Sequence, residues 1–276
     1  HHTDASGVTR TGLEGLKIYL IPDFANLTFK SLIITIMDAM GQLFFSISVA
    51  MGIMVTYGSY AKDDTNLMES VNRIEIFDTA VALFAGSLII PTVFTFMGRE
   101  GMSSGPGLIF ISLPKVFDAM GVVGKFVAPI FFIIVSFAAI TSSVSVMEAM
   151  VSSLMDAFHI TRVKGSLFVI VYTLITGALV CLGYNLLYFE FKFPNGNVGQ
   201  LLDVLDYISN NVFMPLVGLL TSILIGWVVG PKIIIDEVSQ GKYKFGRKKL
   251  YIVMIKFVVP FMLLLLLLQA LGIINL

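Results

Sequence analysis

Apolar residues gather along the chain in six long runs, and each run is long enough to cross a lipid bilayer as a helix. About 20 predominantly apolar residues allow a helix to span a hydrocarbon core roughly 30 Å thick. We therefore expect an all-α membrane protein with spans at residues 32–60, 76–97, 126–155, 166–187, 201–229 and 250–274. A shorter apolar stretch, residues 108–120, falls within the connection 98–125 and predicts a helical loop that lies over the protein.

Basic residues are densest between the last two spans, and this predicts how the helices are oriented. Segment 231–249 holds Lys232, Lys242, Lys244, Arg247, Lys248 and Lys249. The positive-inside rule places this segment in the cytoplasm. Counting back puts connections 61–75 and 156–165 on the same side and the N-terminal tail outside. An outward terminus without a signal peptide predicts an odd number of spans upstream.

The composition supports the membrane assignment and narrows the function. Hydrophobic residues make up 57% of the chain and charged residues 13%, whereas soluble domains carry about a quarter charged residues. The 18 basic and 18 acidic residues cancel, so no net field favours nucleic acid. The single cysteine, Cys181, excludes an internal disulfide framework. We expect no enzyme, because the sequence shows no nucleophile and base pair, histidine cluster or glycine-rich phosphate loop.

The first span carries many small and polar residues for a membrane helix. They are Gly41, Gln42, Ser46, Ser48 and Gly52, and Phe44 and Phe45 lie among them. One interpretation is a helix broken near residues 46–50, whose freed backbone groups line a site. The other is an intact helix in which the serines bond back to the preceding turn and the glycines let neighbouring helices approach.

Hydroxyl-bearing residues also cluster in the third span. The segment contains Ala138, Thr141, Ser142, Ser143 and Ser145, of which Thr141, Ser142 and Ser145 share one helix face. Hydroxyl and carbonyl oxygens are suitable ligands for a sodium ion, as they are for other hard cations. A packing face of small residues is the alternative interpretation.

Three acids lie in or at the ends of the spans. Asp78 is at the expected start of the second span, where an intramembrane carboxylate favours a functional role. The alternative is a cap at a frayed helix end near Arg73. Asp156 lies at the inner end of the third span and Asp206 near the outer end of the fifth, where either could simply be solvated.

Several segments together resemble one transporter family. They are GQLFFSIS at 41–48, IMVTYGSY at 53–60, Asp78-Thr79, AGS at 85–87 with Pro91, AAITSSVSV at 138–146, and LEGLKIYLIPDF at 13–24. The chain resembles helices six to eleven of the neurotransmitter:sodium symporter family, of the bacterial eleven-helix type. The resemblance implies the LeuT-type inverted-repeat transporter fold, present here as the second repeat plus one further helix. Residues 1–31 would be an extracellular tail or loop, and residues 32–274 a six-helix transmembrane domain lacking helices one to five.

The resemblance also implies which residues bind substrate. Positions matching the amino-acid pocket are Phe45, Ser46, Ser48, Met51 and Gly52, with Ser142 and Val146 also facing the substrate. Phe45 would be the outer aromatic lid, and the backbone around Ser46 and Ser48 would bond the substrate's amino group. One departure is Ala50, which stands where the family usually has glycine in an unwound stretch, so its methyl restricts the backbone there.

Ion binding and gating follow from the same resemblance. Ser46 matches a ligand of a first sodium ion, and the Ala138 carbonyl with the Thr141 and Ser142 hydroxyls matches a second sodium site. Asp78 lies in the region where animal members bind chloride, near Gln42; its carboxylate would replace that anion and is also expected beside sodium. Asp206 matches the outer gate, and Tyr60 and Asp156 match the inner gate.

The expected function is sodium-coupled symport of an amino acid by alternating access in the cell membrane. Met51, a flexible thioether, favours neutral substrates with hydrophobic or aromatic side chains. Both sodium sites would need helix one, so the partners are the amino acid, the bilayer and the missing helices one to five, in the same or a separate polypeptide. The alternatives are a non-transporting amino-acid receptor or assembly subunit, and an inactive truncated remnant.

Overall fold

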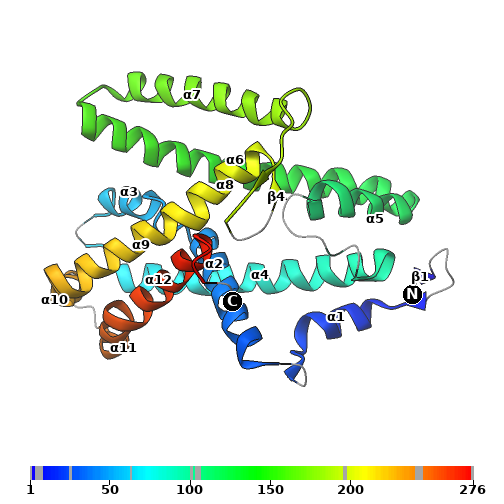
Figure 1. Cartoon of the computed structure of the whole chain (residues 1–276), viewed down its shortest axis with the longest axis horizontal. Helices are drawn as coiled ribbons and strands as arrows, with labels where there is room; N and C mark the ends of the chain where they lie inside the picture. The colour runs from blue at the N-terminus through cyan, green and yellow to red at the C-terminus, as the bar shows by residue number, and fades with distance from the viewer. Residues whose placement is uncertain are drawn as a thin grey trace. The chain divides into compact units, whose positions relative to one another are not determined.

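The computed structural model describes residues 2–3, 9–24, 27–62, 64–99, 102, 107–194, 198–239 and 245–274, and most of these residues are helical (Figure 1). The chain divides into two compact units. The first comprises His1–Leu27 and Arg73–Ser143, and the second comprises Thr28–Asn72 and Val144–Leu276. Two long helices, α4 (Leu67–Met97) and α6 (Val122–Phe158), contribute residues to both units.

The first unit contains most of α4 and the first part of α6, together with shorter elements. These are β1 (His2–Thr3), β2 (Thr9–Arg10), α1 (Gly12–Leu20), η3 (Leu108–Ser112) and α5 (Leu113–Ala119). β1 and β2 pair antiparallel, with His2 opposite Arg10 and Thr3 opposite Thr9. Thr11 and Glu14 form a capping box that begins α1, because each side chain accepts a hydrogen bond from the other's amide.

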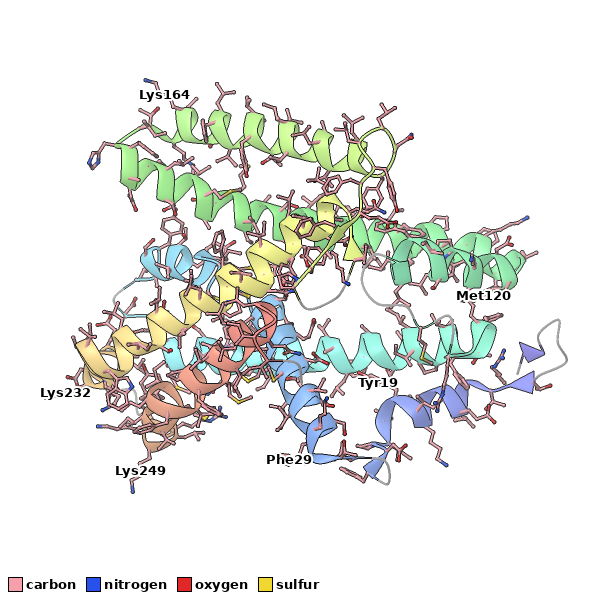
Figure 2. All side chains as sticks on the ribbon, in the orientation of Figure 1. Tyr19, Phe29, Met120, Lys164, Lys232 and Lys249 are labelled. Atoms are coloured by element: carbon pink, nitrogen blue, oxygen red, sulfur yellow. The ribbon has the colours of Figure 1, made fainter. Side chains whose placement is uncertain are left out.

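The core of the first unit lies where α5 packs against α4 and α6. Val93, Leu113, Val116 and Phe117 are buried, and the Phe117 and Phe131 rings lie 5.5 Å apart. The expected helical loop within residues 98–125 is confirmed, since η3 and α5 cover its apolar stretch. α1 is attached to α4 by Tyr19, labelled in Figure 2, whose hydroxyl donates to the Ala82 carbonyl at 3.1 Å.

The second unit begins with two helices, α2 (Phe29–Ser46) and α3 (Ile53–Ser59), and ends with a group of helices that contain π-helical segments. Between them in the chain come the end of α6 and α7 (Arg162–Gly183), which form a helical hairpin. They are followed by a short antiparallel pair, β3 (Phe191–Lys192) and β4 (Val198–Gly199), in which Phe191 lies opposite Gly199. The last elements are α8 (Leu201–Asp206), η4 (Tyr207–Phe213), α9 (Met214–Ile223), η5 (Leu224–Val229), α10 (Pro231–Val238), α11 (Lys248–Val253), η6 (Met254–Val258) and α12 (Val259–Ala270).

α9 and α12 pack side by side, and a glycine sets their separation (Figure 1). A Cβ atom at Gly218 would lie 3.2 Å from Leu263 Cδ1 and 3.6 Å from Phe44 Cε1, so the missing side chain lets α12 and α2 approach α9. At the other end of the pair, the Tyr207 hydroxyl donates to the Ala270 carbonyl. Phe193 stacks on the Tyr207 ring with 4.5 Å between centroids.

Five of the six expected spans are long apolar helices in the part of the chain that the structure describes. They are Leu67–Met97, Val122–Phe158, Arg162–Gly183, Leu201–Val229 and Lys248–Ala270. The remaining one, residues 32–60, is divided between α2 and α3. α4 also begins nine residues earlier than the expected residue 76. Its first turns contain polar residues such as Glu69 and Arg73, which are compatible with helical backbone angles although they lie outside the apolar run.

Candidate functional site

The second unit contains an interrupted helix where the first expected span carries its serines. α2 ends at Ser46 and α3 begins at Ile53 (Figure 1). Between them Ser48, Ala50 and Gly52 have φ angles of 54°, 63° and 78°. Such left-handed angles turn successive peptide groups away from the helix direction and end the regular hydrogen-bond ladder. The predicted break is therefore confirmed, and the alternative of an intact helix is wrong.

Hydrogen bonds hold both sides of the interruption. The Ser48 amide donates to the Phe45 carbonyl at 3.2 Å, and the Val49 amide donates to the Phe44 carbonyl at 3.1 Å. On the other side, the Gly52 carbonyl accepts from the Thr56 amide at 3.0 Å and from the Thr56 hydroxyl at 3.1 Å. The interruption is consequently a short, bounded stretch with peptide dipoles in several directions, which suits the recognition of a small polar group.

The residues expected to face substrate lie on or next to this stretch. Phe45 and Ser46, in the last turn of α2, are exposed, and Phe45 is 43% exposed. Ser48 and Met51 are half-buried in the interruption, and Gly52 is exposed at the start of α3. The interruption thus presents an aromatic ring, hydroxyls and backbone within a few residues, which are the groups needed to hold an amino acid by both its polar and its apolar parts.

A cavity of about 400 Å³ lies beside α2 and is bordered by α9 and α12. Phe45 forms part of its wall. Its polar lining residues are Asp38, Gln42, Asn210, Asn211 and Gln269. The Asn210 side-chain amide donates to Asp206 Oδ1 at 2.6 Å, which links the expected outer-gate acid to the wall of this cavity. Phe45 and the partner of Asp206 therefore meet at one cavity, although they are 165 residues apart along the chain.

The residues of the expected second sodium site lie near the middle of α6. Ala138, Thr141 and Ser142 are exposed, and the Thr141 hydroxyl lies 2.9 Å from the Ala138 carbonyl oxygen, to which it donates. Two oxygens are thus already close together, and the hydroxyl oxygen retains acceptor lone pairs for a cation. Ser142 lies one residue further, and Val146, 43% exposed, lies one helical turn beyond Ser142. This set of hard oxygens fits sodium chemistry.

Asp78 lies in the interior of α4, eleven residues after the first residue of the helix, and its side chain is half-buried. The interpretation of Asp78 as a cap at a frayed helix end is therefore wrong, since α4 begins at Leu67. A carboxylate in the interior of a membrane-length apolar helix is expensive to keep ionised without favourable neighbours. Its position is consistent with the functional interpretation.

A polar network connects α3 to the end of α6 and was not expected from the sequence. The Tyr60 hydroxyl donates to Glu148 Oε1 at 2.6 Å. The Arg162 guanidinium donates to the same carboxylate through Nη1, 3.0 Å from Oε1, and through Nη2, 2.5 Å from Oε2. One turn earlier, the Tyr57 hydroxyl donates to the Ser145 hydroxyl at 2.5 Å. Glu148 is the centre of this network because it holds Tyr60 and Arg162 at once.

One of the two expected inner-gate residues, Tyr60, therefore contacts an acid that was not among the expected gate residues. Tyr60 contacts Glu148, whereas Asp156 is exposed two residues before the end of α6. A sequence signal for Glu148 did exist, because it is an acidic residue inside a long apolar run, the same rule that drew attention to Asp78. Arg162, which begins α7, supplies the compensating charge.

The described residues form long apolar helices, and one further expected span is divided into two shorter helices around a left-handed stretch. This arrangement is typical of multi-pass membrane transporters that use discontinuous helices. The model of the sodium:neurotransmitter symporter family matches residues 5–275. The chain belongs to this family, as the resemblance predicted; the family consists of symporters and not enzymes.

Two curated relatives are similar over most of the chain. An uncharacterized sodium-dependent transporter of Haemophilus influenzae is 32% identical over 253 residues, which are 91% of this chain and 52% of that protein. The uncharacterized sodium-dependent transporter YhdH of Bacillus subtilis is 30% identical over 265 residues, which are 95% of this chain and 56% of YhdH. The chain thus spans about half the length of the curated relatives it matches.

The structure is similar to that of MhsT in complex with L-phenylalanine. The TM-score is 0.77 at 30% sequence identity, over 94% of this chain and 56% of the MhsT chain. The expected LeuT-type transporter fold is confirmed by this match.

Proposed function

We propose that this chain is the C-terminal half of a sodium-coupled symporter for neutral amino acids with hydrophobic or aromatic side chains. The interruption between α2 and α3 carries the proposal, since its exposed ring, hydroxyls and left-handed backbone lie together in a chain of this family. The relatives are named sodium-dependent transporters, and MhsT was crystallised with L-phenylalanine, which supports an aromatic substrate. Helices one to five would complete the transporter from the same or a separate polypeptide.

In this proposal the amino acid binds at the interruption. Phe45 covers it from the outer side, and the backbone around Ser46 and Ser48 accepts hydrogen bonds from its ammonium group. Met51 and Gly52 border the side chain of the substrate, because a flexible thioether beside a glycine adapts to large apolar groups. Ser142 and Val146 complete the wall from α6.

Sodium is the driving cargo, and its proposed ligands are oxygens. Ser46 and the carboxylate of Asp78 are assigned to a first ion, and Ala138, Thr141 and Ser142 to a second. Each charge that crosses 100 mV contributes roughly 2.3 kcal/mol, so two ions moving inward could concentrate an amino acid by several orders of magnitude. The fixed charge of Asp78 also takes the place of chloride in this proposal, because a carboxylate can balance the charge of the bound cations.

Alternating access requires gates on both sides. We assign Phe45 and Asp206 to the outer gate and Tyr60 and Asp156 to the inner gate, with Glu148 and Arg162 holding Tyr60 in place. In this scheme segment 231–249 is cytoplasmic and the N-terminal tail extracellular, in the cell membrane. Of that segment, residues 240–244, which include Lys242 and Lys244, lie outside the described part of the structure.

The test is sodium-driven uptake by the full-length protein in proteoliposomes. Thr141→Ala and Ser142→Ala should each raise the half-saturating sodium concentration at least about tenfold, since a hydrogen-bond-strength contact to a charge contributes roughly 1.5 to 3 kcal/mol. Ser143→Ala is the matched control, because the Ser143 hydroxyl donates to the Ala139 carbonyl at 2.8 Å and lies on another helix face. Unchanged sodium dependence in both variants would contradict the assignment of Thr141 and Ser142 to a sodium site. Binding of the amino acid without accumulation would favour a receptor.

A further inference from the structure

A lysine lies within the last apolar helix, and the structure attaches it to a tryptophan. Lys256 is in η6, inside the membrane-length stretch Lys248–Ala270. Its Nζ lies 5.7 Å from the centre of the Trp227 ring, a cation–π distance. Among the residues that the structure describes, no carboxylate lies within ion-pair distance of this ammonium group. An ammonium at this depth needs an anion or water to offset its desolvation.

A proline in α12 and a glycine in η5 explain why Trp227 lies against Lys256. Pro260 has no N–H to donate to the carbonyl four residues earlier, which is that of Lys256. Trp227 Nε1 donates to this carbonyl instead, at 2.9 Å. Gly226 permits the approach, because a Cβ atom there would lie 2.9 Å from the Ile255 carbonyl oxygen. The indole is therefore fixed on the η6 backbone beside the lysine.

Exposed lysines lie on the side of Lys256 toward which helical side chains lean. Side chains on a helix lean toward its N-terminus, and Lys249 lies in that direction from Lys256, seven residues earlier and about 10 Å away along the axis. Lys248 and Lys249 are exposed at the start of α11, and Lys232 is exposed in the first turn of α10. Figure 2 shows the labelled Lys232 and Lys249 at the same end of these helices.

The surface around this cluster combines positive charge with exposed apolar groups. In the described residues from 224 to 258, the cations Lys232, Arg247, Lys248, Lys249 and Lys256 outnumber the two carboxylates, Asp236 and Glu237. Trp227 is 59% exposed, and Phe257, whose ring packs edge-on against it at 5.6 Å, is 56% exposed. Tryptophan and lysine side chains of this kind are typical of the boundary between hydrocarbon and headgroups.

We propose that Lys256, Trp227 and the lysines at the start of α11 form a binding site for the phosphate headgroup of an anionic phospholipid. The headgroup phosphate supplies the counter-charge for Lys256 and is also reached by Lys248 and Lys249 from the rim. The acyl chains lie along the exposed rings of Trp227 and Phe257. A phospholipid fits better than free phosphate because the half-buried Lys256 and the exposed Lys248 and Lys249 are contiguous with the exposed rings of Trp227 and Phe257.

Trp227 is the only tryptophan in this chain, so its fluorescence reports the site directly. The full-length protein is reconstituted into phosphatidylcholine vesicles with increasing fractions of brominated phosphatidylglycerol, and separately of brominated phosphatidylcholine. The quenching due to Trp227 is obtained by subtracting the signal of the matching Trp227→Phe protein. The wild-type protein should prefer phosphatidylglycerol at least about fivefold, since one lysine near an anionic headgroup contributes about 1 kcal/mol and three lysines reach this one.

Variants separate this site from general attraction to an anionic surface. Lys256→Met should lower the preference about fivefold, whereas Lys256→Arg should keep it, because only the first removes the charge. Lys164→Met, at an exposed position in the first turn of α7, is the matched control and should also keep it. If Lys256→Met prevents folding, the exposed pair Lys248→Gln and Lys249→Gln should reduce the preference instead.

Two results would overturn the proposal. One is an unchanged preference in Lys256→Met, or in the Lys248 and Lys249 double variant where Lys256→Met does not fold. The other is loss of quenching on adding millimolar inorganic phosphate at ionic strength held constant with chloride, which would make the site one for free phosphate. The readout is lipid contact and not transport, so failure of the symport proposal would leave it unaffected.

Discussion

Replacing Ala50 by glycine should make the interrupted conformation easier to form. Ala50 has φ 63°, and the left-handed region costs an L-residue with a Cβ atom about 1 to 2 kcal/mol. Glycine avoids that cost but loses about 0.5 to 1 kcal/mol more backbone entropy when it is ordered. The net gain is about 0.5 to 1 kcal/mol, which shifts the equilibrium toward the interrupted helix about two- to fivefold.

The assay is sodium-dependent binding of labelled amino acid to the full-length protein in detergent. If the ion and substrate bind only the interrupted form, and that form is the minor one in their absence, Ala50→Gly should lower half-saturating sodium about two- to fivefold. Ala50→Val should raise it, because a β-branched side chain fits the left-handed region worse than alanine. Ala39→Gly, the same change at an exposed position inside α2, is the control and should bring no gain. If Ala50→Gly weakens binding as much as Ala39→Gly does, backbone strain at Ala50 is not what limits the interruption.

Two further predictions concern the charged residues of the helices. Asp78→Ser should make uptake by the full-length protein depend on added chloride, because the fixed negative charge is lost; a fully active variant indifferent to chloride would contradict the role given to Asp78. Tyr60→Phe and Glu148→Gln, measured singly and together by thermal unfolding in detergent, should show a coupling energy of about 0.6 to 1.7 kcal/mol, the range of hydrogen bonds between membrane helices. Additive effects of the two changes would mean that the 2.6 Å contact adds no stability.

The interrupted helix could be predicted from sequence because its cause is local. Serines and glycines within an apolar run supply both the flexible backbone and the polar groups that tolerate a break, and the left-handed residues Ser48, Ala50 and Gly52 fall in or next to the expected segment. The ends of α4 and α6 could not be predicted as well. Hydropathy marks only the apolar part of a helix, whereas the helix itself can continue through polar residues, as α4 does in its first turns from Leu67.

The contacts around Glu148 could not be predicted, because they depend on residues far apart in the chain. Tyr57 and Tyr60 each reach a residue 88 positions away, and only the packing of α3 against α6 brings them together. The π-helical segments had a partial signal. The four described π-helical segments, η3, η4, η5 and η6, are followed within two residues by Pro114, Pro215, Pro231 and Pro260 respectively. Pro91 nevertheless lies within continuous α-helix, so proline alone does not predict a π-helical turn.

The π-helical turns also affect how the sequence of this protein is aligned with the sequences of its relatives. A π-helical turn holds one residue more than the α-helical turn it replaces, so it records an insertion inside a helix. A relative that lacks η4 or η5 would need a one-residue gap in the middle of a membrane helix for its later residues to match. An alignment that forbids such gaps would rotate every following position by about 100°, and would pair residues that face lipid with residues that face the interior.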